Sequence, residues 1–146
     1  MIPSASSNVY HAAVTLDAQL RRVKMVCQLI NDNEPVNHII NAYQELTIAI
    51  NYIEALIASG IDLTKVGDAI ALQFGNDSYS SYANSFTSLR TTLIPDFLTK
   101  VKTNETMVFA AVSFDEATGT LVYGNLLAAA RASILTDVTA ILDEFS

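Results

Sequence analysis

The chain has 146 residues, of which 51% are hydrophobic and 16% carry a charge, and its net charge at pH 7 is −7. This length suits one domain with its own core, and the apolar content excludes a disordered chain. The acidic balance argues against direct nucleic-acid binding, which requires a basic surface. The low charged fraction leaves two interpretations of the surface: it is covered by Ser, Thr, Asn and Ala, or it is hidden in contacts with other chains.

The first two segments carry apolar residues at alternating steps of three and four, the spacing of a helix that packs against a partner helix. Only residues 31–35 separate the segments, so we expect an antiparallel pair of helices. The first helix is expected from its N-cap Asn8 to Ile30. The second has Pro35 in its first turn and ends at Gly60. The apolar positions are Val9, Ala13, Leu16, Leu20, Val23, Cys27 and Ile30, then Val36, Ile39, Tyr43, Leu46, Ile50, Ile53 and Ile57.

Additional apolar residues flank the main face of the second segment, so this helix is expected to lie centrally and to contact two or more neighbours. They are Ile40, Ile48, Ala49, Tyr52 and Leu56. A short third helix should begin after Asp62, its N-cap, and end at Gly75. A fourth is expected from Tyr79 to about Thr103, and Pro95 must kink or restart it because proline lacks a backbone N–H.

The periodicity changes after the fourth helix. Residues 107–114 form a short apolar run, and a polar turn ending in Gly119 leads to the β-branched and aromatic residues 120–123. This pattern predicts a β-hairpin over about 107–123, with Gly119 in the left-handed conformation. A helix over residues 107–112 is the alternative, because two alanines lie inside that run.

A last helix is expected from near Asn125 almost to the end of the chain. Its inner positions are Leu127, Ala130, Ile134, Val138, Ile141 and Phe145. The predicted fold is therefore mainly α: a single domain over residues 1–146, built as an antiparallel bundle of four to five helices with one β-hairpin before the last helix.

No motif in the sequence predicts catalysis. There is no Gly-x-Ser-x-Gly elbow, no Gly-Lys-Ser/Thr sequence and no pair of Glu-x-x-His motifs. Glu34 and His38 have the spacing for a weak metal site, but a surface pair or no contact is the favoured interpretation. The single cysteine, Cys27, lies on the apolar face of the first helix and is expected to be core. We therefore expect no enzymatic activity, no cofactor and no metal.

Three cations, Arg21, Arg22 and Lys24, are expected on the outer face of the first helix, together with Asp17 pointing outward. They form either a solvated face or a contact for an acidic partner.

The aromatic residues near position 80 lie among Ser and Asn, a composition typical of adaptable contact surfaces. Their helical spacing favours an inward face, and a contact surface is the alternative. A lone two-stranded hairpin is marginal in water, so it must pack on the bundle, pair with a partner or project as an arm. The candidate interface residues are Tyr79, Tyr82, Phe86, Asp115, Glu116, Thr118, Leu121 and Tyr123.

These features favour a structural or assembly subunit that forms a homo-oligomer or contacts other structural proteins. The expected architecture is similar to that of ring-forming adaptor and connector proteins of bacteriophage tails, which favours a virion component. Without an export signal or a membrane-spanning segment, the expected location is the cytoplasm, with incorporation into a virion. The alternative is a monomeric module that binds a peptide or a small apolar ligand between the second and fourth helices.

Overall fold

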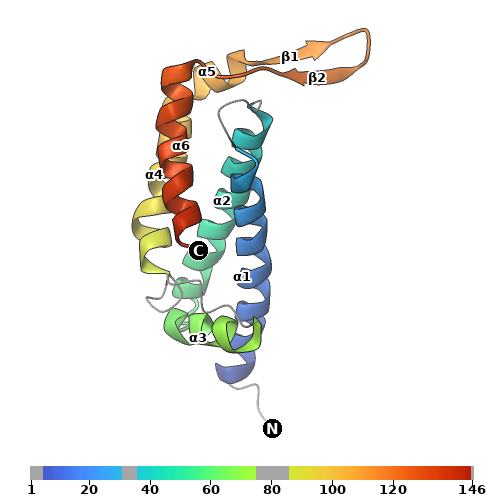
Figure 1. Ribbon diagram of the computed structural model, residues 1–146. Coiled ribbons are helices and arrows are strands. Elements are labelled where there is room, and N and C mark those ends of the chain that lie inside the picture. Colours follow the sequence, from blue (N-terminus) through green and yellow to red (C-terminus); the bar gives the residue numbers. More distant parts are fainter. Residues whose placement is uncertain (1–4, 31–35, 75–85, 146) are drawn as a thin grey trace.

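The structure, a computed structural model, describes residues 5–30, 36–74 and 86–145. Helices α1, α2, α4 and α6 form the long bundle, α3 lies across one end of it, and the hairpin leaves the opposite end (Figure 1). The predicted class, mainly α with a β-hairpin before the last helix, is confirmed. The elements are α1 (Ala5–Gln28), α2 (Asn37–Ala58), α3 (Leu63–Phe74), the π-helix η2 (Leu89–Leu93), α4 (Ile94–Thr103), α5 (Glu105–Ala110), β1 (Val112–Asp115), β2 (Thr120–Tyr123) and α6 (Ala128–Asp143).

The apolar face predicted for α1 is confirmed. Its positions from Ala13 to Ile30 are buried, and Val9 is partly buried against the same core. The N-cap prediction at Asn8 is wrong, because α1 already begins at Ala5. No proline or glycine stands between Ala5 and Asn8, so nothing stops the helix from extending backward past the predicted cap.

The buried face of α2 is rotated relative to the predicted one. Ile57 is exposed and Ile50 is only half-buried, whereas Ala49 is completely buried. The rotation places small alanines toward the neighbouring helices, which permits close approach. Helix α2 contacts both α1 and α4, so its predicted central position is confirmed. The buried residues are Ile39, Ala42, Leu46, Ala49, Ile53 and Leu56.

The end of α2 and the start of α3 follow the predicted local signals. Gly60 has φ +79°, and its N–H donates to the carbonyl of Ile57 at 3.0 Å. The next N–H, of Ile61, donates back to Leu56 at 3.0 Å, which completes a Schellman motif. Asp62 then caps α3, because its Oδ1 accepts the N–H of Thr64 at 3.0 Å. Gly75 and Pro35 lie outside the described residues.

Pro95 restarts the helix that contains it, as predicted. The wider π-turn η2 precedes it, and Pro95 lies in the first turn of α4. Since proline has no N–H to donate to the preceding turn, a regular α-helix through this point would leave a carbonyl without its donor. Helix α4 then runs to Thr103, the predicted end, and buries Ile94, Phe97 and Val101.

The hairpin is shorter than the predicted range 107–123. Residues 107–110 belong to the helix α5, so the alternative helical interpretation applies to them, and the strands span only 112–115 and 120–123. Val108 in α5 is buried in the core, which a projecting strand could not achieve. The turn is as predicted: Gly119 has φ +68°, and its N–H donates to the carbonyl of Asp115 at 2.8 Å.

Helix α6 buries its predicted inner residues with one exception. Leu127 is exposed, and Leu126 occupies the core position in its place. The helix begins only at Ala128, and Leu127 is its extended N-cap residue with ψ 145°. An extended chain alternates its side chains between opposite sides, so Leu126 and Leu127 point in different directions.

Candidate protein–protein interface

The two strands form an arm, residues 112–123, with one apolar face. The pairing is antiparallel, and residues directly opposite each other in such a pair share a face. The pairs Val112–Tyr123 and Phe114–Leu121 therefore lie on the same side of the ribbon. The opposite face carries Ser113, Asp115, Thr120 and Val122.

The base of the arm is fixed to the bundle. Val112 and Tyr123 are partly buried against the core. The N–H of Gly124 donates to Ala111 at 2.7 Å, and the carbonyl of Gly124 accepts the N–H of Val36 at 2.9 Å. A Cβ on Gly124 would lie 3.2 Å from the Ala111 oxygen, so a larger residue would disturb this junction. The arm is therefore held at a defined angle to the helices.

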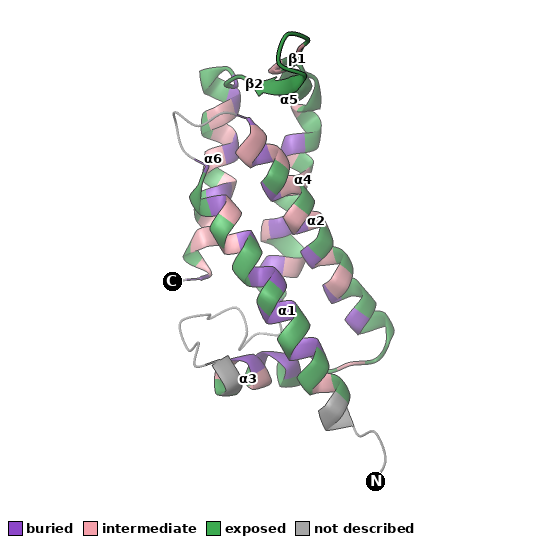
Figure 2. Ribbon diagram, turned by 90° about the vertical axis from the view of Figure 1, so that its right-hand side faces the viewer, coloured by how far each residue is buried: buried purple, intermediate pink, exposed green. Residues whose placement is uncertain are grey.

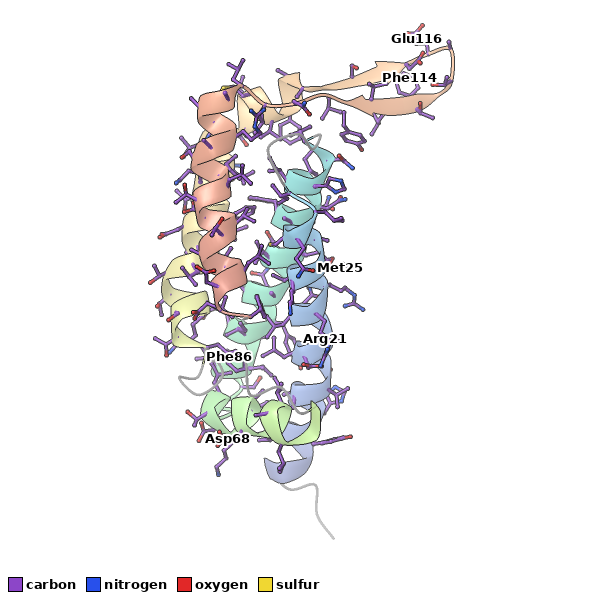
Figure 3. All side chains as sticks on the ribbon, in the orientation of Figure 1. Arg21, Met25, Asp68, Phe86, Phe114 and Glu116 are labelled. Carbon is purple, nitrogen blue, oxygen red and sulfur yellow. The ribbon has the colours of Figure 1, made fainter. Side chains whose placement is uncertain are left out.

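The tip of the arm projects beyond the bundle, where its apolar face is uncovered. Phe114 is 59% exposed and its cross-strand partner Leu121 is 54% exposed. Figure 3 shows Phe114 and Glu116 at the far end of the arm, away from the helices. The turn itself is ordered by Asp115, whose Oδ1 accepts the N–H of Ala117 at 2.9 Å. The sequence left open whether the hairpin packs or projects, and the structure shows that its base packs and its tip projects.

The predicted interface residues separate into two regions of the molecule. Glu116, Thr118 and Leu121 are exposed at the arm tip, Asp115 is half-buried in the turn, and Tyr123 is half-buried at the base. Phe86 is completely buried near the other end of the bundle, so its interpretation as a contact residue is wrong (Figure 3). It is buried as predicted for an inward face, but it lies in a turn with φ +59° and not in the predicted helix. Tyr79 and Tyr82 lie outside the described residues.

Sequence reasoning missed Phe114, which has the largest exposed apolar side chain of the arm. The signal was present: Phe114 alternates with Val112 and directly precedes the turn that begins at Asp115. Pairing the strands outward from that turn places Phe114 opposite Leu121.

A second exposed surface lies on the outer side of α1. Arg21, Arg22, Met25 and Leu29 are exposed there, and Lys24 is half-buried. We call these five residues the basic α1 face. Arg22 Nη1 donates to Gln19 Oε1 at 3.1 Å, and Arg21 Nε donates to Asp17 Oδ2 at 2.8 Å. The face therefore combines positive charge with exposed apolar side chains.

Asp17 is buried instead of pointing outward as predicted. Its side chain is only 6% exposed. Arg21 binds one carboxylate oxygen, and the other finds no hydrogen-bond donor among the described residues. The pair Asp17–Arg21 is thus a structural contact at the inner edge of the basic α1 face.

A groove of about 320 Å³ lies between α2 and the α4–α5 segment. Its floor is mainly apolar, and Lys102 and Glu105 form an ion pair of 3.3 Å at its edge. The lining residues are Ile40, Tyr43, Gln44, Val101, Lys102, Glu105, Val108 and Phe109.

The part of the chain that the structure describes contains no cluster of metal-ligating side chains. Within 5–30, 36–74 and 86–145, no group of three or more His, Cys, Asp or Glu side chains lies close enough to hold a metal ion. Glu34 lies outside the described residues, so the expectation that Glu34 and His38 form a surface pair or no contact, and not a metal site, remains a prediction from sequence. Burial raises the pKa of the Cys27 thiol from 9.0 to about 12, which suppresses the nucleophilic thiolate.

We expect Cys27 to resist a thiol reagent in the native protein at pH 8 and to react fully in urea.

Because the folded pKa of Cys27 lies above the unfolded one, the unfolded state loses its proton first, and the contribution of Cys27 to stability falls as pH rises from about 9 to about 12. Over this range the contribution of Cys27 to the free energy of unfolding should fall by up to ~1.4 kcal/mol per pH unit. Urea unfolding of the wild type and of Cys27→Ala between pH 8 and 10.5 isolates this contribution. A difference between the two proteins that does not change with pH would contradict the raised pKa.

No protein-family model, curated protein or solved structure matches this chain. Across the part of the chain that the structure describes, every helix is too short or too polar to cross a lipid bilayer.

Proposed function

We propose that this chain is a non-enzymatic assembly subunit that contacts other protein chains through its arm within an oligomer. The observation that carries the proposal is the arm itself: its base is anchored on the bundle, and its apolar tip extends into solvent (Figure 1). A two-stranded ribbon is marginally stable alone in water. Covering Phe114 and Leu121 with another chain would remove their apolar surface from water and stabilise the ribbon.

The composition of the whole chain supports the same function. With 16% charged residues, the surface is poor in charged side chains, and the cores of protein–protein interfaces are likewise depleted of them. The proposed partners are further copies of this chain, in a homo-oligomer, or other structural proteins. Phage tail adaptors and connectors also combine a helical bundle with a projecting hairpin, and by this analogy of architecture alone we propose a virion component, synthesised in the cytoplasm.

Absolute mass from size-exclusion chromatography with light scattering, over a range of concentrations, tests the proposal. We expect a defined multimer or a mass that grows with concentration. The double variant Phe114→Ser, Leu121→Ser should keep its helical circular dichroism and shift toward the 15.8 kDa monomer. Burial of each side chain contributes ~1.5–3 kcal/mol, so the dissociation constant should rise about 100-fold or more.

The matched control is Leu72→Ser, which removes an apolar side chain that is 82% exposed on α3, far from the arm. It should assemble like the wild type. A wild-type monomer at every concentration would overturn the assembly function. A double variant that assembles as well as the wild type would show that the arm is not the contact.

The groove between α2 and the α4–α5 segment favours a second candidate, a monomeric module that binds a peptide or a small apolar ligand. Its position matches the site expected from sequence, and its floor is mainly apolar. Native mass spectrometry of the purified monomer distinguishes this candidate by a retained ligand mass, which Phe109→Glu, at an exposed residue of the groove, should abolish.

A further inference from the structure

We propose that the arm of one copy docks on the basic α1 face of a second copy. Phe114 and Leu121 pack against Met25, and Glu116 lies beside Arg22. The inference rests on the proposed assembly function and names the partner as the same chain. Charge, surface shape and the direction of the arm each support it.

The arm is acidic and carries no cation of its own. Asp115 and Glu116 are its only charged residues, and no Lys or Arg occurs between Lys102 and Arg131. Asp115 is engaged in its own turn, which leaves Glu116 as the exposed charge at the tip. A carboxylate at the edge of an apolar tip selects a partner surface that is both apolar and positive.

In a chain with a net charge of −7, such surfaces are scarce. Helix α1 carries three cations, Arg21, Arg22 and Lys24, against one carboxylate, which makes it the most positive of the described helices. Ion pairs engage Lys100 with Asp137 at 3.2 Å and Lys102 with Glu105 at 3.3 Å on α4, and Arg21 with Asp17 at 2.8 Å on α1. Arg22 donates to the neutral amide of Gln19, so its positive charge is not neutralised by that contact.

The shape of the basic α1 face suits an aromatic tip. Met25 is 58% exposed beside a hollow of about 260 Å³ between α1 and α2. A methionine thioether packs favourably against an aromatic ring. The carboxylate of Glu45 also lines the hollow, and the Gln19 amide donates to it at 3.2 Å. The full lining is Arg22, Met25, Val26, Asn41, Gln44 and Glu45.

The direction of the arm requires a second copy. The arm projects over the side of the bundle on which α1 lies, and Figure 2 looks at that side, with α1 in view and the arm above it. Figure 3 shows Arg21 and Met25 well below the arm, so the tip does not reach them within one chain. Because the arm and the basic α1 face lie on the same side, two copies related by a two-fold axis can exchange arms reciprocally.

A charge exchange between the two surfaces tests the docking. Glu116→Arg and Arg22→Glu should each raise the dissociation constant about tenfold, because each places like charges together. Both substitutions in one chain should restore assembly to within about threefold of the wild type. An equimolar mixture of the two single variants should also assemble, because each arm then meets an oppositely charged α1 face on the other protein.

Two controls make the same changes in net charge elsewhere: Asp68→Arg and Lys65→Glu, both on exposed positions of α3 (Figure 3). They should assemble like the wild type, and all variants should keep the wild-type circular dichroism. If the wild type assembles and the arm and α1 variants behave like these controls, the docking is wrong and the assembly function stands. A wild type that is monomeric at every concentration would overturn both.

Discussion

Replacing Leu46 by alanine is expected to lower the free energy of unfolding by about 2–5 kcal/mol. Leu46 is completely buried in the middle of α2, the helix that contacts both α1 and α4. Truncation removes apolar atoms from the core and leaves a cavity that the surrounding helices cannot fully close. Urea unfolding followed by circular dichroism, at a concentration where one species is present, measures the change.

The matched control is Ile48→Ala, two residues further along the same helix. Ile48 is 51% exposed, so the same truncation there should cost less than about 0.5 kcal/mol. Ile50 is half-buried, and Ile50→Ala should fall between the two. A loss below about 1 kcal/mol for Leu46→Ala, or an equal loss for Ile48→Ala, would contradict the observed rotation of α2.

Replacing Phe86 by alanine is expected to lower the free energy of unfolding by about 3–5 kcal/mol. Phe86 is completely buried, among the largest side chains of the core. Phe114→Ala, which removes the same ring from the exposed arm tip, should leave monomer stability nearly unchanged and weaken assembly. The opposite pattern, with Phe86 controlling the assembled mass, would restore the surface interpretation of Phe86.

The backbone at Phe86 gives a second test of its environment. Its φ is +59°, in the left-handed region that glycine adopts without strain. Phe86→Gly should therefore be no less stable than Phe86→Ala, although glycine normally destabilises a fixed backbone relative to alanine. A clear further loss in the glycine variant would show that this conformation is not retained.

The turn of the arm could be predicted from sequence, whereas the exposure of its tip could not. The turn depends only on local residues: Asp115 accepts a hydrogen bond within the turn, and Gly119 adopts a positive φ. The exposure of the tip was not evident from sequence, because it depends on where the base of the arm attaches to the bundle. Hydrogen bonds of Gly124 with Ala111 and Val36 fix that attachment, and they join residues that are distant in the chain.

The basic α1 face was partly predictable. The positions of Arg21 and Arg22 followed from the periodicity of the helix, since Leu20 and Val23 are core. The burial of Asp17 did not follow, because α1 contacts α3 and α6 as well as α2, and the apolar periodicity does not reveal these additional contacts. The apolar periodicity of a helix indicates the face that packs on its main partner and does not reveal further helices that contact it.

Features that depend on local residue spacing or on a few adjacent residues could be predicted from the sequence: the apolar face of α1, the stop at Gly60, the cap at Asp62, the restart at Pro95 and the turn at Gly119. Backbone hydrogen bonding and side-chain spacing decide these locally. The choice between neighbouring apolar residues depended on tertiary packing and backbone direction. Leu126 is buried in preference to Leu127, a residue of the same size, because the extended backbone at Leu127 points the two side chains to opposite sides. Ala49 is buried in preference to the larger Ile50 because close packing of α2 against its neighbouring helices selects a side chain by the space available and not by its hydrophobicity alone.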